Sequence, residues 1–427
     1  MSAVWVSPGT VSGTVLAPAS KSYTHRAVVA AALTGNEYRI SNPLVAEDTL
    51  ATARAVASLG FTIRRRERVW TVRPAEVARP QRKVAYIDCR RSGTTLRLMT
   101  ALAATRSTPV RFGGDAELVR RPMAPLIAAL RKGGVRVEGS TAASGLPFEI
   151  QGPLRPIDTS LRVDASSQFV SALLFVLPIL PRRSRLRFRG EPVSYDYIQA
   201  TAQVLRAHRI RCSLSRRRAS VPGDQRYRGR SFHVPGDASS SAYLWAAAAV
   251  SSGQVRVRGI EPSWAQADLA ILPILEKMGA RVRRHADGAT VEGNGLSPVD
   301  IDLTDSPDLY PLVAVLAAVA PGTSHLRGAR HVVFKESDRR ASAIRLVRAL
   351  GGRSSARVGD LRIEGTARPR SFRWTTSTDH RVVMAAAVGA LVPPHRSQVG
   401  RPEAVHKSYP EYWTTLRRIG ARTEPVR

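Results

Sequence analysis

The sequence predicts a mixed α/β protein in which one structural unit is repeated six times. Six short apolar segments each begin with Ser, Thr or Asp residues. Each is followed by an amphipathic segment that ends in a turn and continues into a β-like stretch. The apolar segments also recur at nearly constant intervals of 71, 74, 71, 71 and 71 residues. Their markers are Lys21, Ser92, Ser166, Asp237, Asp308 and Asp379.

The apolar segments are predicted to be buried helices, because they are apolar nearly all round. In chain order they are SKSYTHRAVVAAAL, SGTTLRLMTALAA, SSQFVSALLFVLPIL, DASSSAYLWAAAAV, SPDLYPLVAVLAAVA and TDHRVVMAAAVGAL. Their polar first residues suit N-caps. Helix N-termini also attract anions, so the same residues would form an anion pocket if the helices met there. Basic residues within these starts favour the pocket, since a cap needs no cation.

The amphipathic segments are predicted to be helices with one polar face. They are EDTLATARAVASLGFTI, RRPMAPLIAALRKGGVRV, SYDYIQATAQVLRAHRIRC, WAQADLAILPILEKMGARV, ESDRRASAIRLVRALGGR and YPEYWTTLRRIGART. Their turn positions lie 39 to 43 residues after the markers, at Gly60, Gly134, His208, Gly279, Gly351 and Gly420. Glycine at five of the six is typical of a helix C′ position. Each unit therefore reads β-α-β-α-β-β over about 72 residues.

Length and composition restrict the class of protein. A chain of 427 residues exceeds what one hydrophobic core usually organises, so we expect two domains or a repeat architecture. No apolar run reaches the length of a membrane span, and the first residues lack a signal peptide pattern, so we expect a soluble cytoplasmic protein. Two cysteines, Cys89 and Cys212, exclude a disulfide framework. The nine histidines show no metal-ligand spacing, and we expect neither metal nor cofactor.

The net charge of +32 first suggests a nucleic-acid partner. However, 59 of the 65 basic residues are arginine, which indicates a general arginine bias. The basic runs also lack the interleaved aromatic residues of a single-strand-binding surface. We therefore expect a solvated basic surface and no nucleic-acid partner.

The six lysines are more informative, because an ammonium can titrate and a guanidinium cannot. Lys21, Lys335 and Lys407 fall in SKSYTHR, FKESDRR and HKSYPEYW, beside predicted helix starts. Each could form a structural salt bridge or donate a proton to a reacting oxygen. Glu336 follows Lys335 directly, and Asp308 begins a buried helix, where an acid is either a cap or a proton-transfer group.

Further charged residues stand at other helix starts: Arg121, Asp338, Arg339, His380 and Arg381. Bidentate arginine suits carboxylate recognition, while lysine and helix N-termini suit phosphate. Several cations with two candidate acids and no metal therefore indicate a small substrate that carries carboxylate and phosphate groups.

The motifs, taken together, resemble the 5-enolpyruvylshikimate-3-phosphate synthase family of enolpyruvyl transferases. They occur in the order SKSYTHRA, SGTTLR, RRPM, SSQF, GDASSSAY, PD at 307–308, KESDR, DHR and KSYPEYW. The resemblance runs from near residue 10 to near residue 420. It implies two lobes of three units each, with residues 1–17 and 236–427 in the first lobe and 18–235 in the second. It also implies that the lobes close over the substrates.

The resemblance implies transfer of the enolpyruvyl group of phosphoenolpyruvate to the 5-hydroxyl of shikimate 3-phosphate. The hydroxyl adds to phosphoenolpyruvate to form a tetrahedral intermediate, which then eliminates phosphate. This reaction belongs to the shikimate pathway of aromatic amino-acid biosynthesis. Asp308 resembles the base at the 5-hydroxyl, Glu336 the group that exchanges the C3 proton, and Lys21 a cation and acid at the bridging oxygen. His380 is implied as auxiliary. The implied partners are the two substrates alone, and we expect a monomer.

Substrate contacts are implied in the same way. Those to shikimate 3-phosphate are Lys21, Ser22, Arg26, Ser166, Ser167, Gln168, Ser194, Tyr197, Asp308 and Lys335. Those to phosphoenolpyruvate are Lys21, Gly93, Arg121, Gln168, Arg339, Arg381 and Lys407.

The chain departs from the family pattern at two places. Arg90 and Arg91 stand where the family usually has Gly-Asn, and His331 stands where it often has Asn. Arg91 could add a phosphate contact, or both arginines could reflect composition or damage the loop. Two alternative functions stay open: an enolpyruvyl transferase acting on UDP-N-acetylglucosamine, and a non-catalytic nucleic-acid-binding relative. The first has Lys-Asn where this chain has Lys21-Ser22.

Overall fold

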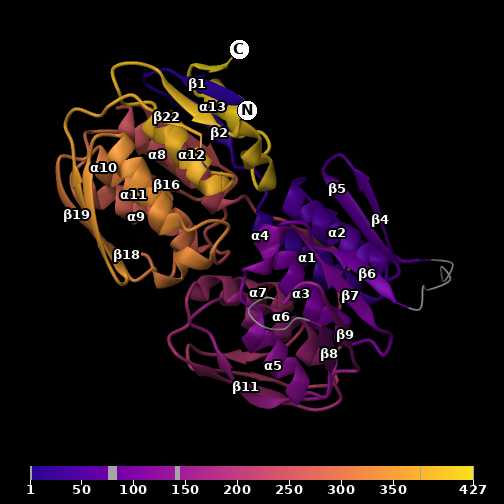
Figure 1. Cartoon of the computed structure of the whole chain (residues 1–427). Coiled ribbons are helices and arrows are strands. Elements are labelled where there is room, and N and C mark those ends of the chain that lie inside the picture. Colours follow the sequence, from indigo (N-terminus) through magenta and orange to yellow (C-terminus); the bar gives the residue numbers. More distant parts are fainter. Residues whose placement is uncertain (1, 76–83, 140–144, 376, 427) are drawn as a thin grey trace. The chain divides into compact units, whose positions relative to one another are not determined.

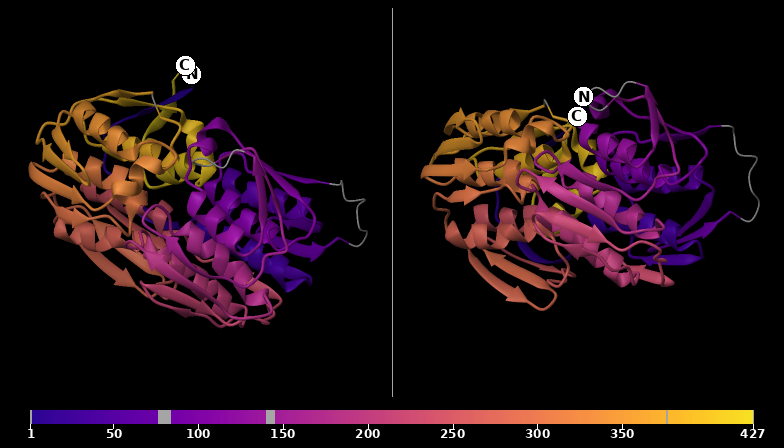
Figure 2. Two further views of the ribbon diagram at one scale, coloured as in Figure 1. Left: turned by 60° about the horizontal axis from the view of Figure 1, so that its bottom comes forward. Right: turned by 90° about the horizontal axis from the view of Figure 1, so that it is seen from below.

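The computed structural model describes residues 2–75, 84–139, 145–375 and 377–426 (Figure 1). The chain divides into two compact units. We call Met1–Pro18 with Gly236–Arg427 the split unit, and Ala19–Pro235 the continuous unit. In each unit the sheets lie on the outer side and cover helices packed within (Figure 2). The predicted mixed α/β fold class is confirmed.

Six four-stranded sheets, one for each repeat, are formed by the described residues. In the orders given below, the first pair of strands in each sheet is parallel and the other two pairs are antiparallel. This is the pairing that a β-α-β-α-β-β unit produces, because a helix separates the parallel strands and a hairpin joins the last two.

The continuous unit holds three of these sheets. They are β14 (Ser231–His233), β3 (Tyr38–Ser41), β5 (Val69–Pro74) and β4 (Phe61–Arg66); β6 (Ala85–Asp88), β7 (Val110–Gly113), β9 (Phe148–Gln151) and β8 (Arg136–Gly139); and β10 (Asp158–Arg162), β11 (Ser184–Arg189), β13 (Arg218–Val221) and β12 (Ser213–Leu214). The last strand of this unit, β14, pairs with β3 in the sheet of the first repeat.

The split unit holds the other three. They are β2 (Ser12–Leu16), β15 (Gln254–Arg258), β17 (Gly288–Glu292) and β16 (Arg281–His285); β18 (Asp300–Asp302), β19 (Gly322–Arg327), β21 (Asp360–Gly365) and β20 (Arg353–Arg357); and β22 (Arg373–Trp374), β23 (Ser397–Gly400), β1 (Ala3–Val6) and β24 (Thr423–Pro425). The N-terminal strands β1 and β2 thus complete sheets whose other strands lie in the C-terminal half.

The first helix of each repeat is buried, as predicted. These helices are α1 (Lys21–Thr34), α3 (Gly93–Ala103), α6 (Gln168–Val176), α8 (Ala238–Val250), α10 (Tyr310–Ala318) and α12 (His380–Gly389). In α8 every residue from Ala238 to Ala249 is buried. Small residues on all sides let neighbouring helices approach closely, and α8, α10 and α12 form the core of the split unit.

The second helix of each repeat buries one face, again as predicted. These helices are α2 (Glu47–Ser58), α5 (Ala124–Lys132), α7 (Tyr195–Ala207), α9 (Ile271–Lys277), α11 (Arg339–Ala349) and α13 (Tyr412–Arg418). The remaining short helices are α4 (Ala116–Val119), η1 (Leu177–Ile179), η2 (Ala267–Ala270), η3 (Pro307–Leu309), η4 (Arg330–Phe334) and η5 (Pro402–Lys407). None of the described helices combines the length and apolar character needed to cross a bilayer.

The turn prediction is right in five repeats and wrong in one. Each predicted turn glycine has a positive φ, between 83° and 102°. In the third repeat, however, His208 has φ −95° and is the C-cap of α7. The left-handed residue is its neighbour Arg209, with φ 61°. The sequence alone did not identify Arg209 as the left-handed residue, because the usual signal for that position is a glycine.

Candidate active site

The polar cluster of the split unit is centred on the buried guanidinium of Arg339, the first residue of α11. Its Nε donates to Asp379 Oδ2 at 2.9 Å, its Nη1 to Asp308 Oδ1 at 2.6 Å and its Nη2 to Glu336 Oε2 at 2.8 Å. One side chain therefore holds three carboxylates from three separate elements. Charge-assisted bonds of this length are among the strongest that side chains make.

Two more cations surround the carboxylate of Asp308. Arg381 Nη2 lies 3.3 Å from Oδ2, and Lys335 Nζ lies 3.8 Å from Oδ1. Burial alone would raise the pKa of Asp308, but Arg339, then Lys335 and Arg381, hold it well below the usual value. Asp308 is thus an ionised acceptor at neutral pH. Among the described residues no backbone N–H donates to it, so the interpretation of Asp308 as a helix cap is wrong.

At four of the other predicted helix starts, a polar residue is the N-cap. The side chains of Ser20, Ser92, Asp237 and Asp379 each accept a hydrogen bond from a backbone N–H in the first turn. Ser167, at the start of α6, makes no such bond. Capping and anion binding are therefore not exclusive alternatives across the six repeats, because the caps are hydroxyl or carboxylate side chains and the cations beside them are other residues.

Three further predicted residues of the split unit are buried near this cluster. Lys407 ends η5, which packs against α12. The Nδ1 atom of His380 lies 3.6 Å from Asp379 Oδ1. Within the described residues neither ring nitrogen of His331 has a hydrogen-bond partner, and burial followed by the charge of Lys335 lowers its pKa to about 3. His331 is therefore a neutral imidazole with both nitrogens available.

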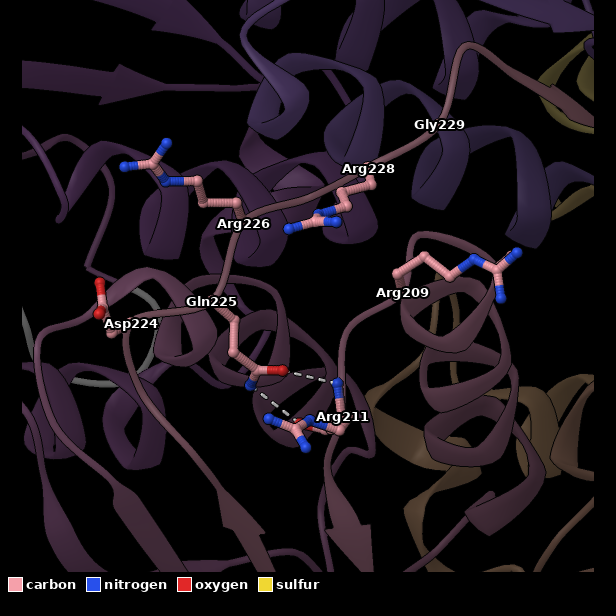
Figure 3. Close-up of a pocket in the computed structure, with 8 residues that line it drawn as sticks. Arg209, Arg211, Asp224, Gln225, Arg226, Arg228 and Gly229 are labelled. Atoms are coloured by element: carbon pink, nitrogen blue, oxygen red, sulfur yellow. Dashed lines mark hydrogen bonds between the residues drawn. The ribbon is translucent and has the colours of Figure 1, made fainter.

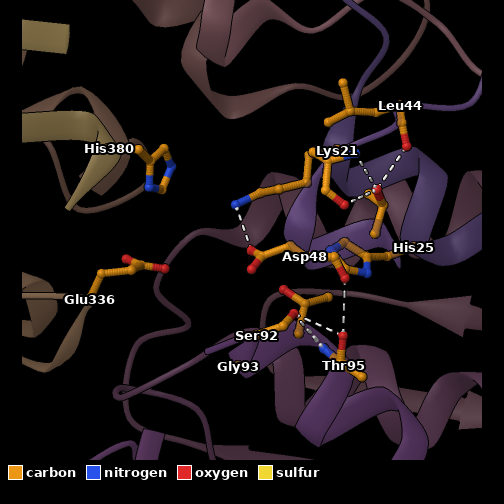
Figure 4. Close-up of polar contacts among 12 residues, drawn as sticks. Lys21, His25, Leu44, Asp48, Ser92, Gly93, Thr95, Glu336 and His380 are labelled. Atoms are coloured by element: carbon orange, nitrogen blue, oxygen red, sulfur yellow. Dashed lines mark hydrogen bonds and ion pairs between the residues drawn. The ribbon is translucent and has the colours of Figure 1, made fainter. Parts of the chain in front are cut away.

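The polar cluster of the continuous unit begins at Lys21, the first residue of α1. Its Nζ lies 3.2 Å from Oδ2 of the buried Asp48 in α2 (Figure 4). Thr95 of α3 donates to the backbone carbonyl of Asp48 at 3.4 Å. The hydroxyl of Thr95 also lies 2.8 Å from that of Ser92, the cap of α3. These contacts join the starts of three helices around the lysine.

Arg26 joins α1 to α7. Its Nε donates to Thr201 Oγ1 at 2.9 Å, its Nη1 to the carbonyl of Ser22 at 2.9 Å and its Nη2 to the carbonyl of Tyr197 at 2.8 Å. Burial lowers its pKa to about 10, so the guanidinium is charged at neutral pH. It therefore positions the two helix starts that carry predicted substrate contacts.

Gly93 stands where two guanidinium groups approach the backbone. A Cβ there would lie 2.8 Å from Arg97 Nη1 and 3.2 Å from Arg121 Nη2, so a larger residue would displace them. Arg97 Nη1 also donates to Gln168 Oε1 at 2.7 Å. The glycine thus permits a concentration of positive charge at the start of α3 that suits an anion.

The start of α7 carries the buried hydroxyl of Ser194, which makes no hydrogen bond to the described residues. Ser194 is the N-cap residue of α7, with φ 54°. A buried hydroxyl without a partner is costly, so this one is well placed to bind a ligand. At the start of α6, Ser166 Oγ accepts from the backbone N–H of Gln168 at 3.2 Å.

The structure thus brings the predicted residues together separately within each unit. In the continuous unit they gather at the starts of α1, α3, α6 and α7 and in the turn before α5: Lys21, Ser22, Arg26, Gly93, Arg121, Ser166, Ser167, Gln168, Ser194 and Tyr197. In the split unit, Asp308, Lys335, Glu336, Arg339 and Arg381 form one cluster with Lys407 on the adjacent η5. No group of three or more His, Cys, Asp or Glu within the described ranges could hold a metal ion.

Comparison with known protein families matches residues 6–416 to EPSP synthase (3-phosphoshikimate 1-carboxyvinyltransferase). The chain belongs to the EPSP synthase family. The resemblance inferred from the motifs is therefore confirmed, and so is the prediction of a transferase.

Relatives in this family match along nearly their whole length. A 3-phosphoshikimate 1-carboxyvinyltransferase of Methanocorpusculum labreanum is 36% identical, with 97% of this chain and 98% of the relative covered. One from Thermococcus kodakarensis is 39% identical, with 96% and 98% covered. These names favour neither the UDP-N-acetylglucosamine alternative nor the nucleic-acid-binding one.

Solved structures agree on the fold. EPSP synthase from Acinetobacter baumannii superposes with a TM-score of 0.82 at 22% identity, with all of both chains covered. The enolpyruvyl transferase NikO from Streptomyces tendae gives 0.80 at 19% identity, with 100% of this chain and 99% of that chain covered. The enolpyruvyl-transferase-like fold predicted from the repeats and the resemblance is confirmed.

Sequence reasoning missed two residues of the continuous unit's cluster. Asp48 follows Glu47 in the first turn of α2, where any acid is expected to complement the helix dipole. Arg97 lies within the SGTTLR motif but is one arginine among 59. Only the tertiary contacts with Lys21 and Gln168 distinguish them from ordinary surface charges.

Asp268, in η2 of the split unit, was also missed. Ser239 Oγ donates a short hydrogen bond to its carboxylate, and the carbonyl of Ser239 accepts from Arg381 Nη1 at 2.9 Å. Burial, then the negative charge of Asp308, raise the pKa of Asp268 to about 6. Asp268 is therefore linked to Arg381 through Ser239, and burial favours its protonated form.

The two unusual arginines have carboxylate neighbours. Arg90 is left-handed with φ 50°, and its backbone N–H donates to Asp88 Oδ1 at 2.8 Å. Arg91 Nε lies 3.9 Å from Glu117 Oε2. A glycine would adopt the conformation of Arg90 without strain, which explains the residue that the EPSP synthase family usually has there.

Replacement of Arg339 by Ala is expected to destabilise the split unit by about 3–5 kcal/mol, because three carboxylates would lose their shared partner in a buried site. Urea unfolding followed by tryptophan fluorescence measures the change. Arg353→Ala is the control, since its pair with Glu364 is exposed. A loss at Arg339 no larger than the control's would contradict the central place of this guanidinium.

Replacement of Asp268 by Asn is expected to change the pH dependence of stability. The raised pKa means that the folded chain holds this proton more tightly than the unfolded chain, so the stabilisation is present below about pH 4 and is lost as pH rises through about 6. The variant should therefore gain about 2 kcal/mol relative to the parent between about pH 4.5 and about pH 7.5.

Urea unfolding at the two pH values measures this gain. Asp287→Asn is the control, because Arg258 lowers the pKa of that exposed carboxyl and the trend should be opposite in sign and smaller. A pH-independent difference for Asp268→Asn would show that its carboxyl does not titrate in this range.

Proposed function

We propose that this chain transfers the enolpyruvyl group of phosphoenolpyruvate to the 5-hydroxyl of shikimate 3-phosphate and releases phosphate. The observation that carries the proposal is the Arg339 cluster, in a member of the EPSP synthase family. It supplies two carboxylates, Asp308 and Glu336, with fixed orientation and adjacent cations. An addition followed by an elimination needs this combination of acid/base groups and positive charge.

Each carboxylate has a separate part in the proposed reaction. Asp308, held ionised, accepts the proton of the 5-hydroxyl as its oxygen adds to C2 of phosphoenolpyruvate. Glu336, in its protonated form, gives its proton to C3 in the addition, and the resulting carboxylate takes a proton back from C3 in the elimination. The ammonium of Lys21 donates to the bridging oxygen as phosphate departs, and Asp48 fixes its position at 3.2 Å.

The proposed substrate contacts follow the anion chemistry of the two clusters. Phosphoenolpyruvate carries a carboxylate and a phosphate, and its proposed contacts are Lys21, Gly93, Arg121, Gln168, Arg339, Arg381 and Lys407. Shikimate 3-phosphate carries a phosphate, a carboxylate and two hydroxyls, and its proposed contacts are Lys21, Ser22, Arg26, Ser166, Ser167, Gln168, Ser194, Tyr197, Asp308 and Lys335. The free hydroxyl of Ser194 and the available nitrogens of His331 support phosphate binding.

We further propose that the protein works as a cytoplasmic monomer, without a cofactor and without a nucleic-acid partner. Both Cys89 and Cys212 are free thiols, as suits a reducing compartment. The paired acids and cations described above account for the chemistry of the transfer without a further group.

The purified protein, mixed with phosphoenolpyruvate and shikimate 3-phosphate, is expected to release phosphate and form one new enol ether, detected by phosphate assay and mass spectrometry. Absence of release at every pH from about 6 to about 9 would overturn the proposal. Release only with UDP-N-acetylglucosamine as acceptor would overturn it in favour of the sister reaction.

Glu336→Gln is expected to lower kcat by about a hundredfold or more, because the amide cannot exchange the C3 proton. Glu276→Gln is the matched control, since Glu276 is exposed and its ion pair is with Arg284 on the surface. Equal activity of both variants would remove Glu336 from the proposed chemistry.

Asp48→Asn is expected to lower kcat/KM by about tenfold to a hundredfold with little loss of stability, because Lys21 would lose the charge that orients it. Steady-state kinetics with each substrate varied in turn measures the effect. Unchanged kinetics would show that Lys21 needs no carboxylate to hold it.

A further inference from the structure

A basic hollow of about 800 Å³ lies beyond the C-terminal end of α7 in the continuous unit (Figure 3). It is lined by residues of two segments, 207–211 and 224–229. Four of the lining residues are arginines and one, Asp224, is acidic, so the hollow has a surplus of three positive charges. The arginines are Arg209, Arg211, Arg226 and Arg228.

These four guanidinium groups differ from the paired arginines of the outer sheet faces. Examples of such pairs are Arg258 with Asp287 at 3.0 Å and Arg353 with Glu364 at 2.8 Å. Within the described residues, none of the four in the hollow has an ion pair. Several unpaired like charges around one hollow repel one another, and a bound anion would remove that repulsion.

The backbone of Arg209 gives a second, independent indication. It occupies the C′ position of α7 in the left-handed conformation, with φ 61°. The corresponding residue in every other repeat is glycine: Gly60, Gly134, Gly279, Gly351 and Gly420. At this turn position only the third repeat has a left-handed residue with a side chain, and that side chain lines the hollow.

The two segments of the hollow are held together rigidly. Gln225 accepts from the backbone N–H of Arg211 at 2.8 Å and donates to the carbonyl of Arg211 at 3.0 Å (Figure 3). The backbone N–H of Arg228 donates to the carbonyl of His208 at 3.0 Å. In Figure 3 the guanidinium groups of Arg211 and Arg228 lie between the segments, with those of Arg209 and Arg226 at opposite ends. A rigid frame lowers the cost of ordering these side chains around a ligand.

We propose that this hollow binds a small anion with two or more linked phosphate groups. A phosphate monoester carries a charge of about −1.5 to −2 at neutral pH, so a surplus of three charges is matched by at least two phosphates. Guanidinium groups bind phosphate oxygens in a bidentate manner, which suits four arginines better than a compact ion with one charge.

The proposed site is separate from the predicted substrate contacts. Ser194 and Tyr197 lie at the opposite end of α7, which has 13 residues and is therefore about 20 Å long. Both ends of the helix can thus be occupied at the same time. The proposal does not depend on the reaction proposed above.

Titration calorimetry of the full chain with sodium tripolyphosphate, in about 0.15 M salt, tests the site. The test variant is Arg209→Gly/Arg211→Gln/Arg228→Gln. The matched control is Arg64→Gln/Arg66→Gln/Arg68→Gln, which removes the same charge from exposed arginines of the same unit that have no ion pair within its described residues. Neither variant changes a residue among the substrate contacts proposed above.

We expect the test variant to weaken one binding event by about tenfold or more, and the control to change it by less than about twofold. Arg209→Gly alone should weaken binding without lowering the thermal midpoint of unfolding, since glycine suits the backbone at that position. Equal losses in both triple variants, no loss in the test variant, or no binding by the parent at about 1 mM tripolyphosphate would each overturn the proposal.

A nucleoside triphosphate in a parallel titration distinguishes the sources of the phosphate chain. Tighter binding than tripolyphosphate, lost in the test variant, identifies a nucleotide, and equal binding identifies the phosphate chain alone. A single-stranded RNA oligomer that binds more tightly than either, and is weakened equally by both triple variants, would overturn the proposal in favour of a diffuse polyanion surface.

Discussion

The guanidinium of Arg339 is the constraint on which the split unit's candidate site depends. Three carboxylates lie in a largely buried region: Asp308, Glu336 and Asp379. Burying any of these negative charges without a partner would cost free energy of folding. Because Arg339 bonds to all three, it fixes η3, the start of α11 and the start of α12 relative to one another. Arg381 and Lys335 add positive charge beside Asp308, and Ser239 links Asp268 to Arg381.

The repeat explains why such a cluster occurs at helix starts. Every unit buries an apolar helix, and a buried helix start must satisfy its free N–H groups. Small polar residues do so at Ser20, Ser92, Asp237 and Asp379. The charged residues near these caps are therefore not needed to satisfy the helix start and can contact other helices. In the continuous unit, Lys21 of α1 pairs with Asp48 of α2, and Arg26 of α1 donates to the carbonyl of Tyr197 in α7.

The abundance of arginine hides functional charges among ordinary ones. Several arginines on the sheet faces pair with a nearby carboxylate, and these exposed pairs contribute little to stability because they are well solvated. Arginines with a functional role can be distinguished from these by burial of the side chain or by the lack of an ion pair. Arg26, Arg97 and Arg339 are buried within helix contacts. Arg209 instead is exposed, has no ion pair with any described residue, and has a left-handed backbone where the other five repeats have glycine.

The sequence by itself determined the repeat, the buried and half-buried helices, the sheet pattern and the family, because apolar periodicity, caps and turn glycines act between near neighbours in the chain. It could not identify Asp48, Arg97, Asp268 or the left-handed Arg209. For the first three, the importance depends on contacts between distant residues: Asp48 meets Lys21 across 27 positions, and Arg97 meets Gln168 across 71. Only the packing of helices from different repeats decides which of many similar charges meet, since burial there makes an unpaired charge too costly to keep.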